Sequence, residues 1–419
     1  MSHAMLERAR KVTASQNWEV HPRFPFIMDR AAGVHMWDHD GNRYVDFTSC
    51  SGAAPLGAGF REVLDRTVEE MYRTGGIVAG PLSTLRVELA ERLCALFPGA
   101  ERVLFFRTGS CATTAAVRLA RIHTGKRHVL TSGFHGWHDW HLQYRPHLAL
   151  PDRDPDTTDF GYDLARLAEL GAAREPAAVI VTPEVNFFPE SYLRELAKTT
   201  RSFGALLIVD EVMTGFRYAP GGYAAAAGVR PDLITISKGL ANGMALSAVL
   251  GSDAVMSAQE KTYVGNTFQR ELTPFAAALA TLDVYRREPP LERMDHIGKL
   301  LMDGLNDLFE RNDIPAWAFA RSTMFDLVFA DIDNGHDFCT EMWRRGFLMQ
   351  YGGRFMPSAA TAEDDIEQAL HAARLTIEST CERGQRPPTP PVAALIPFAG
   401  ENFAATSDSV ERWSSDADQ

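Results

Sequence analysis

Two short apolar runs in the stretch Ala205–Ser252 each end near a charged side chain, and this pattern constrains the fold more than any other feature. Ala205–Val209 runs into Asp210, and Leu233–Ile236 is followed two residues later by Lys238. Apolar runs of about four to six residues bounded by turn signals are typical of buried parallel strands. In open α/β sheets, ligands bind at the carboxyl ends of such strands. We therefore expect the carboxylate and the amine to face a common crevice at one edge of one sheet.

This pair of side chains predicts a particular kind of ligand. A carboxylate stabilises a protonated ring nitrogen, and a lysine amine forms a Schiff base with an aldehyde carbon. Pyridoxal 5'-phosphate carries both groups, so we expect it to be the cofactor. Lys238 and Asp210 are the predicted catalytic residues. The alternatives are a surface lysine after a strand and a buried aspartate with another partner.

The bulk composition is that of an ordinary globular protein. The chain has 419 residues, of which 45% are hydrophobic and 23% charged, which is enough for one large domain and a smaller one. The formal net charge of −12 disfavours nucleic acid and anionic membranes as partners. The charge favours cationic small molecules only weakly, because solubility explains it equally well.

The cysteines and the N-terminal residues indicate a cytoplasmic protein. The cysteines are odd in number and lack metal-binding spacing, which favours reduced thiols. Met1–Ser15 carries charges and has no apolar core of a secretory signal, and no run has the length of a membrane span. The cysteines are Cys50, Cys94, Cys111, Cys339 and Cys381.

A glycine and a serine separate an expected strand from an expected helix. Val103–Arg107 has the pattern of a strand, Cys111–His123 that of an alanine-rich helix, and Gly109 and Ser110 lie between them. The free N–H groups of a first helical turn bind anions, so this turn is a candidate phosphate site. Many such turns contain glycine and serine only as helix caps, and this alternative stays open.

An aromatic, histidine-rich loop follows the expected strand His128–Thr131. It contains Phe134, His135 and His138, which can stack on or hydrogen-bond to a ring. A packed surface loop is the simpler interpretation of this loop taken alone. We expect no metal here, because cysteine or carboxylate ligands at suitable spacing are missing.

Strands and helices alternate from Val103 to Leu250, which predicts the fold class α/β with a doubly wound, mostly parallel central sheet. We expect a β-hairpin near the N-terminus, with an Asp-Gly turn between Val34–Trp37 and Arg43–Phe47. Shorter strands and the helix Ala362–Glu378 predict a smaller α+β domain toward the C-terminus.

The expected domain boundaries follow from this alternation. Residues 1–75 are the N-terminal part of the small domain, 76–290 the large cofactor-binding domain, and 291–381 the C-terminal part of the small domain. Residues 382–419 are rich in proline, serine and aspartate, so we expect an extended, partly disordered tail.

Four segments together resemble the class III pyridoxal-phosphate aminotransferases, most closely their glutamate-1-semialdehyde aminomutase-like branch. The resemblance extends over roughly Phe24 to Glu378. It implies the type I fold of pyridoxal-phosphate transferases, with a small domain made from the N- and C-terminal segments. It also implies a homodimer with active sites at the subunit interface. The segments are Phe134–Asp139, Asp210–Arg217, Ser237–Gly239 and Gly265–Phe268.

The resemblance also implies roles for single residues. Lys238 holds the cofactor as the internal aldimine and moves the substrate proton, and Asp210 pairs with the pyridine nitrogen. Thr267 reaches the phosphate from the neighbouring subunit. Val212 and Phe134 cover the two ring faces. The other implied cofactor contacts are Gly109, Ser110, His135, Glu184 and Asn186, and the last two are alternatives for the ring 3′-oxygen.

The substrate side departs from the aminomutase pattern. The region around Trp18 lacks the arginine that holds a carboxylate in the aminomutase, and Ser51 stands where a bulky tryptophan is usual. Tyr351 and Arg354 lie in a segment that also differs. These four are the expected substrate residues, and they suggest a roomier pocket. Arg354 also fits an ordinary surface or interface arginine.

We therefore expect an aminotransferase that passes an amino group from an amino donor to an aldehyde or ketone. The acceptor suggested by the opened pocket is an oxidised amino sugar of an aminoglycoside-type antibiotic pathway. The alternatives are an aminomutase or a pyridoxal-phosphate-dependent eliminase on the same scaffold, a transaminase of a small keto acid, or a catalytically silent binding protein. The presence of both Lys238 and Asp210 argues against the silent protein.

Overall fold

The computed structural model describes residues 2–13, 26–76, 80–144, 154–403, 405 and 407–414. The chain forms two compact units. The small unit contains Met1–Phe60 and Glu292–Ala394, and the large unit contains Arg61–Leu291 and Leu395–Gln419. The domain boundaries expected at residues 75, 290 and 381 stay predictions.

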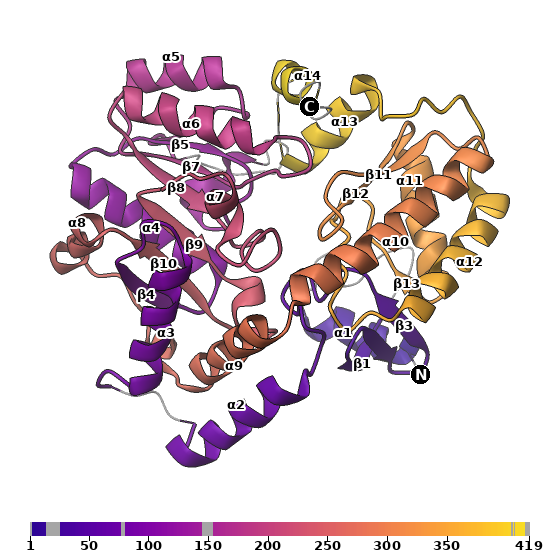
Figure 1. Ribbon diagram of the computed structural model, residues 1–419, viewed down its shortest axis with the longest axis horizontal. Coiled ribbons are helices and arrows are strands. Elements are labelled where there is room, and N and C mark those ends of the chain that lie inside the picture. The colour runs from indigo at the N-terminus through magenta and orange to yellow at the C-terminus, as the bar shows by residue number, and fades with distance from the viewer. Residues whose placement is uncertain are drawn as a thin grey trace. The chain divides into compact units, whose positions relative to one another are not determined.

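A seven-stranded sheet forms the centre of the large unit (Figure 1). Its strand order is β4-β10-β9-β8-β7-β5-β6. All pairs from β9 to β6 are parallel, whereas β10 is antiparallel to both of its neighbours. The predicted α/β class with a mostly parallel sheet is therefore confirmed. The strands are β4 (Arg102–Phe106), β5 (Val129–Ser132), β6 (Thr157–Asp159), β7 (Ala178–Val181), β8 (Leu206–Asp210), β9 (Leu233–Ile236) and β10 (Ser247–Gly251).

Helices precede, separate and follow these strands along the chain. They are α2 (Arg61–Thr74), α3 (Thr84–Leu96), α4 (Gly109–Thr124), α5 (Leu164–Arg174), α6 (Glu190–Ser202), α7 (Gly222–Ala226), α8 (Asp253–Met256) and α9 (Thr273–Arg287). The described residues also form the 3₁₀ turns η1 (Asp139–Tyr144), η2 (Lys238–Ala241), η3 (Ser257–Lys261) and η4 (Thr267–Arg270). The alanine-rich face of α4 is buried against the sheet, because its small side chains let the helix approach the strands closely.

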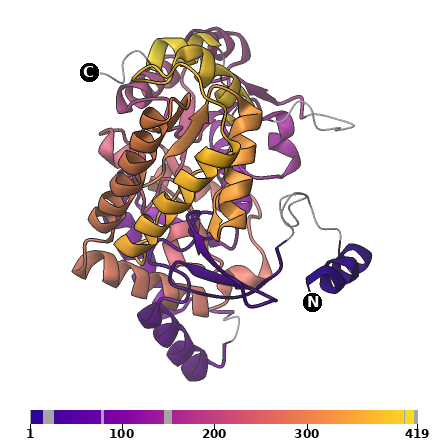
Figure 2. The ribbon, with the colours of Figure 1, turned by 90° about the vertical axis from the view of Figure 1, so that its right-hand side faces the viewer.

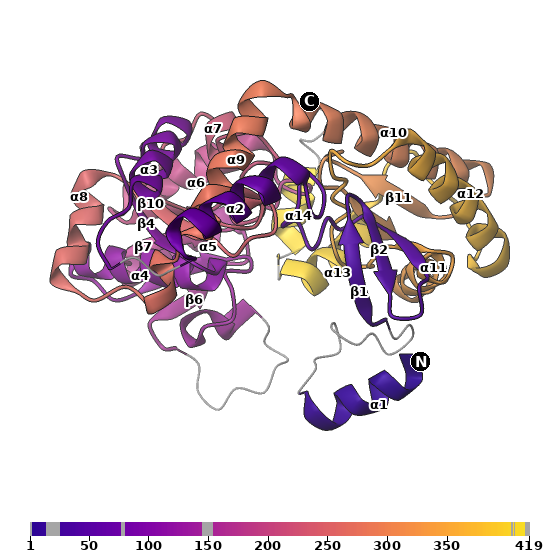
Figure 3. The same ribbon diagram turned by 90° about the horizontal axis from the view of Figure 1, so that it is seen from below.

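The small unit contains the predicted hairpin. A four-stranded sheet has the order β1-β2-β3-β13, with β1 and β2 visible in Figure 3. The Asp38 carboxylate accepts hydrogen bonds from the backbone N–H groups of Asp40 and Asn42, which fixes the turn. The strands are β1 (Met28–Ala32), β2 (His35–Asp38), β3 (Arg43–Asp46) and β13 (Phe347–Leu348).

A separate strand pair and long helices complete the small unit. α11 packs against α12, seen in orange and gold in Figure 2. The strands are β11 (Ala316–Phe319) and β12 (Asp326–Phe329), which are antiparallel. The helices that lie wholly or mostly in the small unit are α1 (Ser2–Val12), α10 (Pro290–Arg311), α11 (Ile332–Arg344) and α12 (Glu363–Thr380).

The segment expected to be an extended tail contains two helices, α13 (Val392–Phe403) and α14 (Ser407–Ser414). α13 forms because its apolar residues find a partner surface: Leu395, Phe398 and Ala399 are buried. Of the residues that the structure describes, none belongs to a helix able to span a membrane, and none joins a cluster able to hold a metal ion.

Candidate active site

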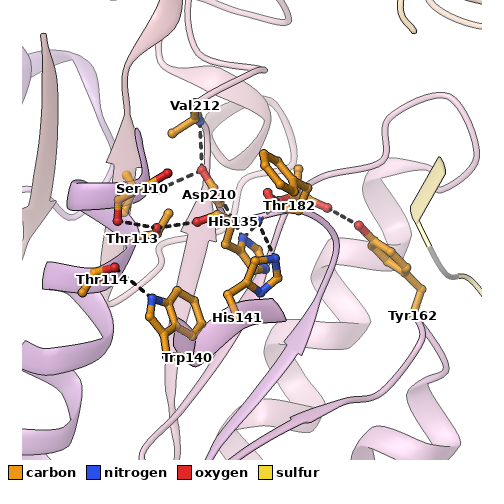
Figure 4. Close-up of polar contacts among 12 residues, drawn as sticks. Ser110, Thr113, Thr114, His135, Trp140, His141, Tyr162, Thr182, Asp210 and Val212 are labelled. Atoms are coloured by element: carbon orange, nitrogen blue, oxygen red, sulfur yellow. Dashed lines mark hydrogen bonds and ion pairs between the residues drawn. The ribbon is translucent and has the colours of Figure 1, made fainter. Parts of the chain in front are cut away.

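Asp210 ends β8 and is buried at the carboxyl edge of the sheet (Figure 4). Its Oδ2 atom lies 2.8 Å from Nδ1 of His135. Its Oδ1 atom accepts hydrogen bonds from the Thr235 hydroxyl at 2.9 Å and from the Val212 N–H at 3.1 Å. A carboxylate offers about four acceptor positions. The described residues occupy three, so Oδ2 keeps one position for a further donor such as a pyridinium N–H.

His135 is fixed on its backbone as well as on its ring. Its N–H donates to Nε2 of His141 at 2.8 Å, and its carbonyl accepts from the Thr113 hydroxyl at 2.7 Å. Burial lowers the pKa of His141 well below its usual value, and the electrostatic effect of the nearby His135 ring adds a smaller decrease. His141 is therefore neutral near pH 7 and can accept this hydrogen bond. Thr182 donates to the Phe134 carbonyl at 2.8 Å and lies 3.1 Å from Nδ1 of His135.

Glycines bring the histidine loop and the loop after β8 onto the start of α4. Gly136 has φ +98°, and a Cβ atom there would lie 2.2 Å from Oγ of Ser110. A Cβ atom on Gly109 would lie 3.1 Å from both methyl groups of Val212. The predicted phosphate turn and the predicted ring-contacting Val212 are thus in contact.

The first turn of α4 offers hydrogen-bond donors at this place. Thr108 caps the helix, and its hydroxyl accepts from the N–H of Cys111. The first N–H groups of a helix have no acceptor within the helix, and the helix dipole adds positive charge there. Gly109 and Ser110 are the first two residues of α4. The turn therefore has the chemistry of a phosphate site.

Lys238 follows β9 and begins η2 with a left-handed backbone, φ +27°. Its side chain is partly buried, and Nζ lies 3.6 Å from Sδ of Met213. Met213 belongs to the same loop as Val212 and Asp210. The structure therefore brings the amine of Lys238 to the loop that carries the carboxylate.

The ring of Phe134 is not part of the packed core. It is 52% exposed, and its centroid lies 6.1 Å from that of His141 in an edge-to-face arrangement. Glu184 and Asn186 are buried in the turn after β7, where the Glu184 carbonyl accepts from the N–H groups of Phe187 and Phe188. Their contact with a cofactor oxygen stays a prediction.

Thr267 is exposed and begins η4. A capping box between Asn266 and Gln269 fixes this turn. Arg107, the residue that follows β4, donates to the carbonyls of Phe268 and Glu271 at 2.5 and 2.6 Å, so the turn is tied to the sheet. Its contact with a phosphate of a neighbouring subunit stays a prediction.

Three of the four expected substrate residues belong to the small unit. Ser51 is exposed with φ +57°, and Arg354 is partly buried. Tyr351 is buried, and its hydroxyl lies 3.3 Å from the N–H of Phe329, so its ring has a packing role in this unit. Trp18 lies outside the described residues.

Residues beyond the predicted set also build the site. Thr235 places a hydroxyl group in the otherwise apolar strand β9. It lies opposite Asp210 in the strand register, and its hydroxyl donates to the Asp210 carboxylate. A polar residue in a buried strand is a readable signal for a hydrogen bond to a neighbouring strand. His141 and Thr182 gave weaker signals, because one lies in a 3₁₀ turn and the other at an ordinary strand end.

The chain is similar to known proteins along most of its length. The family described as Aminotransferase class-III matches residues 15–144 and 156–377. A 2'-deamino-2'-hydroxyneamine transaminase from Streptomyces kanamyceticus is 37% identical over 88% of this chain and 95% of its own. A glutamate-1-semialdehyde 2,1-aminomutase from Methanothrix thermoacetophila is 32% identical over 91% of this chain and 95% of its own. The structure of the FumI protein of Sphingopyxis sp. MTA144, in its pyridoxal-phosphate internal aldimine form, matches with a TM-score of 0.83 at 28% sequence identity. The match covers 90% of this chain and 96% of the FumI chain.

The fold and the site thus define an aminotransferase that depends on pyridoxal phosphate. The chain belongs to the class III aminotransferase family. The residues fit the cofactor, because a lysine amine, a buried carboxylate with an open acceptor position and a helix N-terminus occur together in the large unit.

Proposed function

We propose that Lys238 and Asp210 are the catalytic pair of this aminotransferase. The observation that carries the proposal is the fixed Asp210 carboxylate at one strand end, with Lys238 contacting the adjoining loop. Pyridoxal phosphate supplies the electron-withdrawing ring that stabilises negative charge on the substrate carbon. With the cofactor bound, Nζ of Lys238 would hold its aldehyde carbon and, as a free amine, would move the substrate proton. The carboxylate of Asp210 would keep the ring nitrogen protonated.

The other residues orient the ring. Val212 and Phe134 are proposed to contact its two faces, and Gly109 and Ser110 to bind its phosphate. Support comes from the contact between Gly109 and Val212 and from the half-exposed Phe134 ring. His135 holds the carboxylate of Asp210 in place through the 2.8 Å contact.

Replacement of Lys238 tests the catalytic pair. The wild-type holoenzyme is expected to show a visible absorption band near about 400–420 nm from the lysine-bound cofactor, and an amino donor should bleach it. Lys238→Ala should lose both the band and turnover. Lys198→Ala, a change at an exposed lysine on α6, is the matched control. A Lys238→Ala protein that keeps wild-type turnover would refute the assignment.

We propose an oxidised amino sugar of the aminoglycoside type as the amino acceptor. Support comes from the similarity to the neamine-type transaminase along nearly its whole length, and the net charge of −12 suits cationic substrates. The test is amine transfer from a panel of aminoglycosides to a 2-oxo acid, followed by mass spectrometry. A higher kcat/KM for short amino acids than for every amino sugar would overturn the substrate proposal while leaving the cofactor chemistry intact.

An aminomutase is the second candidate, favoured by the 32% identity to glutamate-1-semialdehyde 2,1-aminomutase. It predicts conversion of glutamate 1-semialdehyde without any added amino donor or acceptor. Product analysis under these conditions separates the two functions, because a transaminase needs a second substrate to complete its cycle.

We propose that the chain acts as a homodimer in the cytoplasm. α2 packs on α9 with one face, while Leu64, Val68, Met71 and Tyr72 form an exposed apolar stripe on α2. An exposed stripe of this kind is typical of an association surface. Sedimentation of the holoenzyme tests the dimer.

The cytoplasmic location is supported by the five cysteines, all of which are free thiols.

A further inference from the structure

The C-terminal helices α13 and α14 lie after residue 377, where the match to the family model ends. From Leu395 onward this segment belongs to the large unit. Leu395, Phe398, Ala399 and Val410 are buried, so the segment is packed onto that unit. Figure 1 shows both helices, in yellow, beside the part of the large unit that carries α6 and α7.

The first contact of this segment is with the turn after β7. The ring of Phe398 stacks on that of Phe187, with 5.9 Å between centroids and 25° between planes. The N–H of Phe187 donates to the carbonyl of Glu184 at 3.0 Å. α13 therefore packs on the turn that carries Glu184 and Asn186.

The second contact is with the turn after β6. The hydroxyl of Ser409, on α14, donates to the carbonyl of Gly161 at 3.1 Å. The next residue, Tyr162, has a left-handed backbone, φ +58°, and is fully buried. Its N–H donates to the Ser132 hydroxyl at 3.0 Å, and its own hydroxyl donates to the Thr182 carbonyl at 2.9 Å. Tyr162 is thus fixed between three strand ends.

These contacts continue to the candidate site. The Thr182 hydroxyl donates to the Phe134 carbonyl and lies 3.1 Å from Nδ1 of His135, which in turn contacts Asp210. Figure 4 shows Tyr162, Thr182, His135 and Asp210 in this order. Tyr162 also stacks on Phe188, with 4.8 Å between centroids, which joins the two turns.

We propose that α13 and α14 form a positioning element of the active site, which holds the turns after β6 and β7 and thereby fixes Phe134 and His135. This role rests on the proposed cofactor contacts of those two residues. Phe398 and Ser409 are positioning residues, since they act through Phe187 and Tyr162. Active sites lose rate when a supporting shell moves reacting groups by about 1 Å, which is the expected consequence of loosening this segment.

The test uses the full-length holoenzyme with Phe398→Ala, Phe398→Leu and Ser409→Ala. The matched control is Glu411→Ala, a change at an exposed residue of α14. The dissociation constant of pyridoxal phosphate and the visible circular dichroism per bound cofactor are measured, together with kcat/KM and the melting temperature. Phe398→Ala is expected to weaken cofactor binding about tenfold and Ser409→Ala about threefold to fivefold, which are typical effects of an aromatic pair and of one hydrogen bond.

Phe398→Leu should recover most of the dichroism, and Glu411→Ala should match the wild type. A fall in melting temperature with unchanged cofactor affinity, dichroism and kcat/KM would overturn the proposal, because the segment would then only stabilise the fold. If Phe398→Ala does not fold, the milder Phe398→Leu and Ser409→Ala decide the matter by the same measurements. A wild-type protein without the visible band would refute the proposed function instead, and that result is separate from any difference among the variants.

Discussion

The Asp210 carboxylate is held by His135 at 2.8 Å from one side and by Thr235 at 2.9 Å from the neighbouring strand. Both partners are buried, so the carboxylate has one orientation before any ligand binds. The remaining acceptor position on Oδ2 of Asp210 therefore has a fixed direction. A preorganised charge of this kind needs no reorganisation when the reaction begins.

Asp210→Asn should keep the cofactor bound to Lys238 but lower kcat by about a hundredfold to a thousandfold, because loss of a buried charge partner costs roughly 3–5 kcal/mol. Half-reaction kinetics with a single amino donor measure this step directly. Asp163→Asn is the control, since Asp163 caps α5 and should affect stability only. A decrease in kcat of less than tenfold would contradict the role given to Asp210.

Gly136→Ala should damage the site, whereas Gly125→Ala should not. Both glycines have left-handed backbones, with φ +98° and +71°. A Cβ atom on Gly136 would overlap Ser110, while one on Gly125 would meet nothing within 4 Å. We expect both to cost about 1–2 kcal/mol of stability from the backbone alone. Only Gly136→Ala should also weaken pyridoxal-phosphate binding, which fluorescence titration measures. Equal affinities in the two variants would show that the contact with Ser110 is unimportant.

The buried Glu211 should make stability fall as the pH rises. Burial raises its pKa to about 7, although hydrogen bonds from Thr214, Ala224 and Tyr223 act in the opposite direction. Between its ordinary pKa near 4.5 and about 7, the folded protein therefore binds a proton that the unfolded chain releases. The stability from this group is complete below pH 4.5 and is lost as the pH rises through 7.

Glu211→Gln removes this titration. Relative to the variant, the wild type should lose roughly 3 kcal/mol between pH 4.5 and 8, as seen by melting temperatures across that range. The comparison cancels His141, whose lowered pKa makes stability fall below pH 6.5 in both proteins. Parallel pH profiles for the two proteins would show that Glu211 does not titrate in this range.

Shared active sites predict complementation between two inactive variants. A heterodimer of Lys238→Ala and Thr267→Glu subunits has one site with both lesions and one with neither, if Thr267 serves the neighbouring subunit. Its activity should be about half that of the wild type by this symmetry. The two homodimers serve as inactive controls. An inactive heterodimer, purified through two different affinity tags, would place Thr267 in the site of its own subunit.

The sequence was informative about the strand ends and less so about strand direction. β8 and β9 were readable because apolar runs stop at Asp210 and near Lys238. β10 is also an apolar run, but such a run has the same pattern in either direction. Its antiparallel course follows from a connection of only Ser237–Leu246, too short for the crossover of a dozen or more residues that parallel strands need.

Other parts of the site depended on tertiary contacts. Nε2 of the His141 ring accepts a hydrogen bond from the backbone N–H of His135. No periodic pattern in the sequence encodes this loop geometry. The helical tail was predicted wrongly as extended, because composition favoured disorder while the apolar residues Leu395 and Phe398 find a docking surface only in the folded unit.

The left-handed backbone of Lys238 has an evolutionary consequence. A non-glycine residue with φ +27° is held against its intrinsic preference, at a cost on the order of 1–3 kcal/mol. Selection for stability alone would replace this lysine by glycine or asparagine. The catalytic role proposed for Lys238 therefore predicts a trade-off between reactivity and thermal stability at this position, and stabilising changes are better sought away from the end of β9.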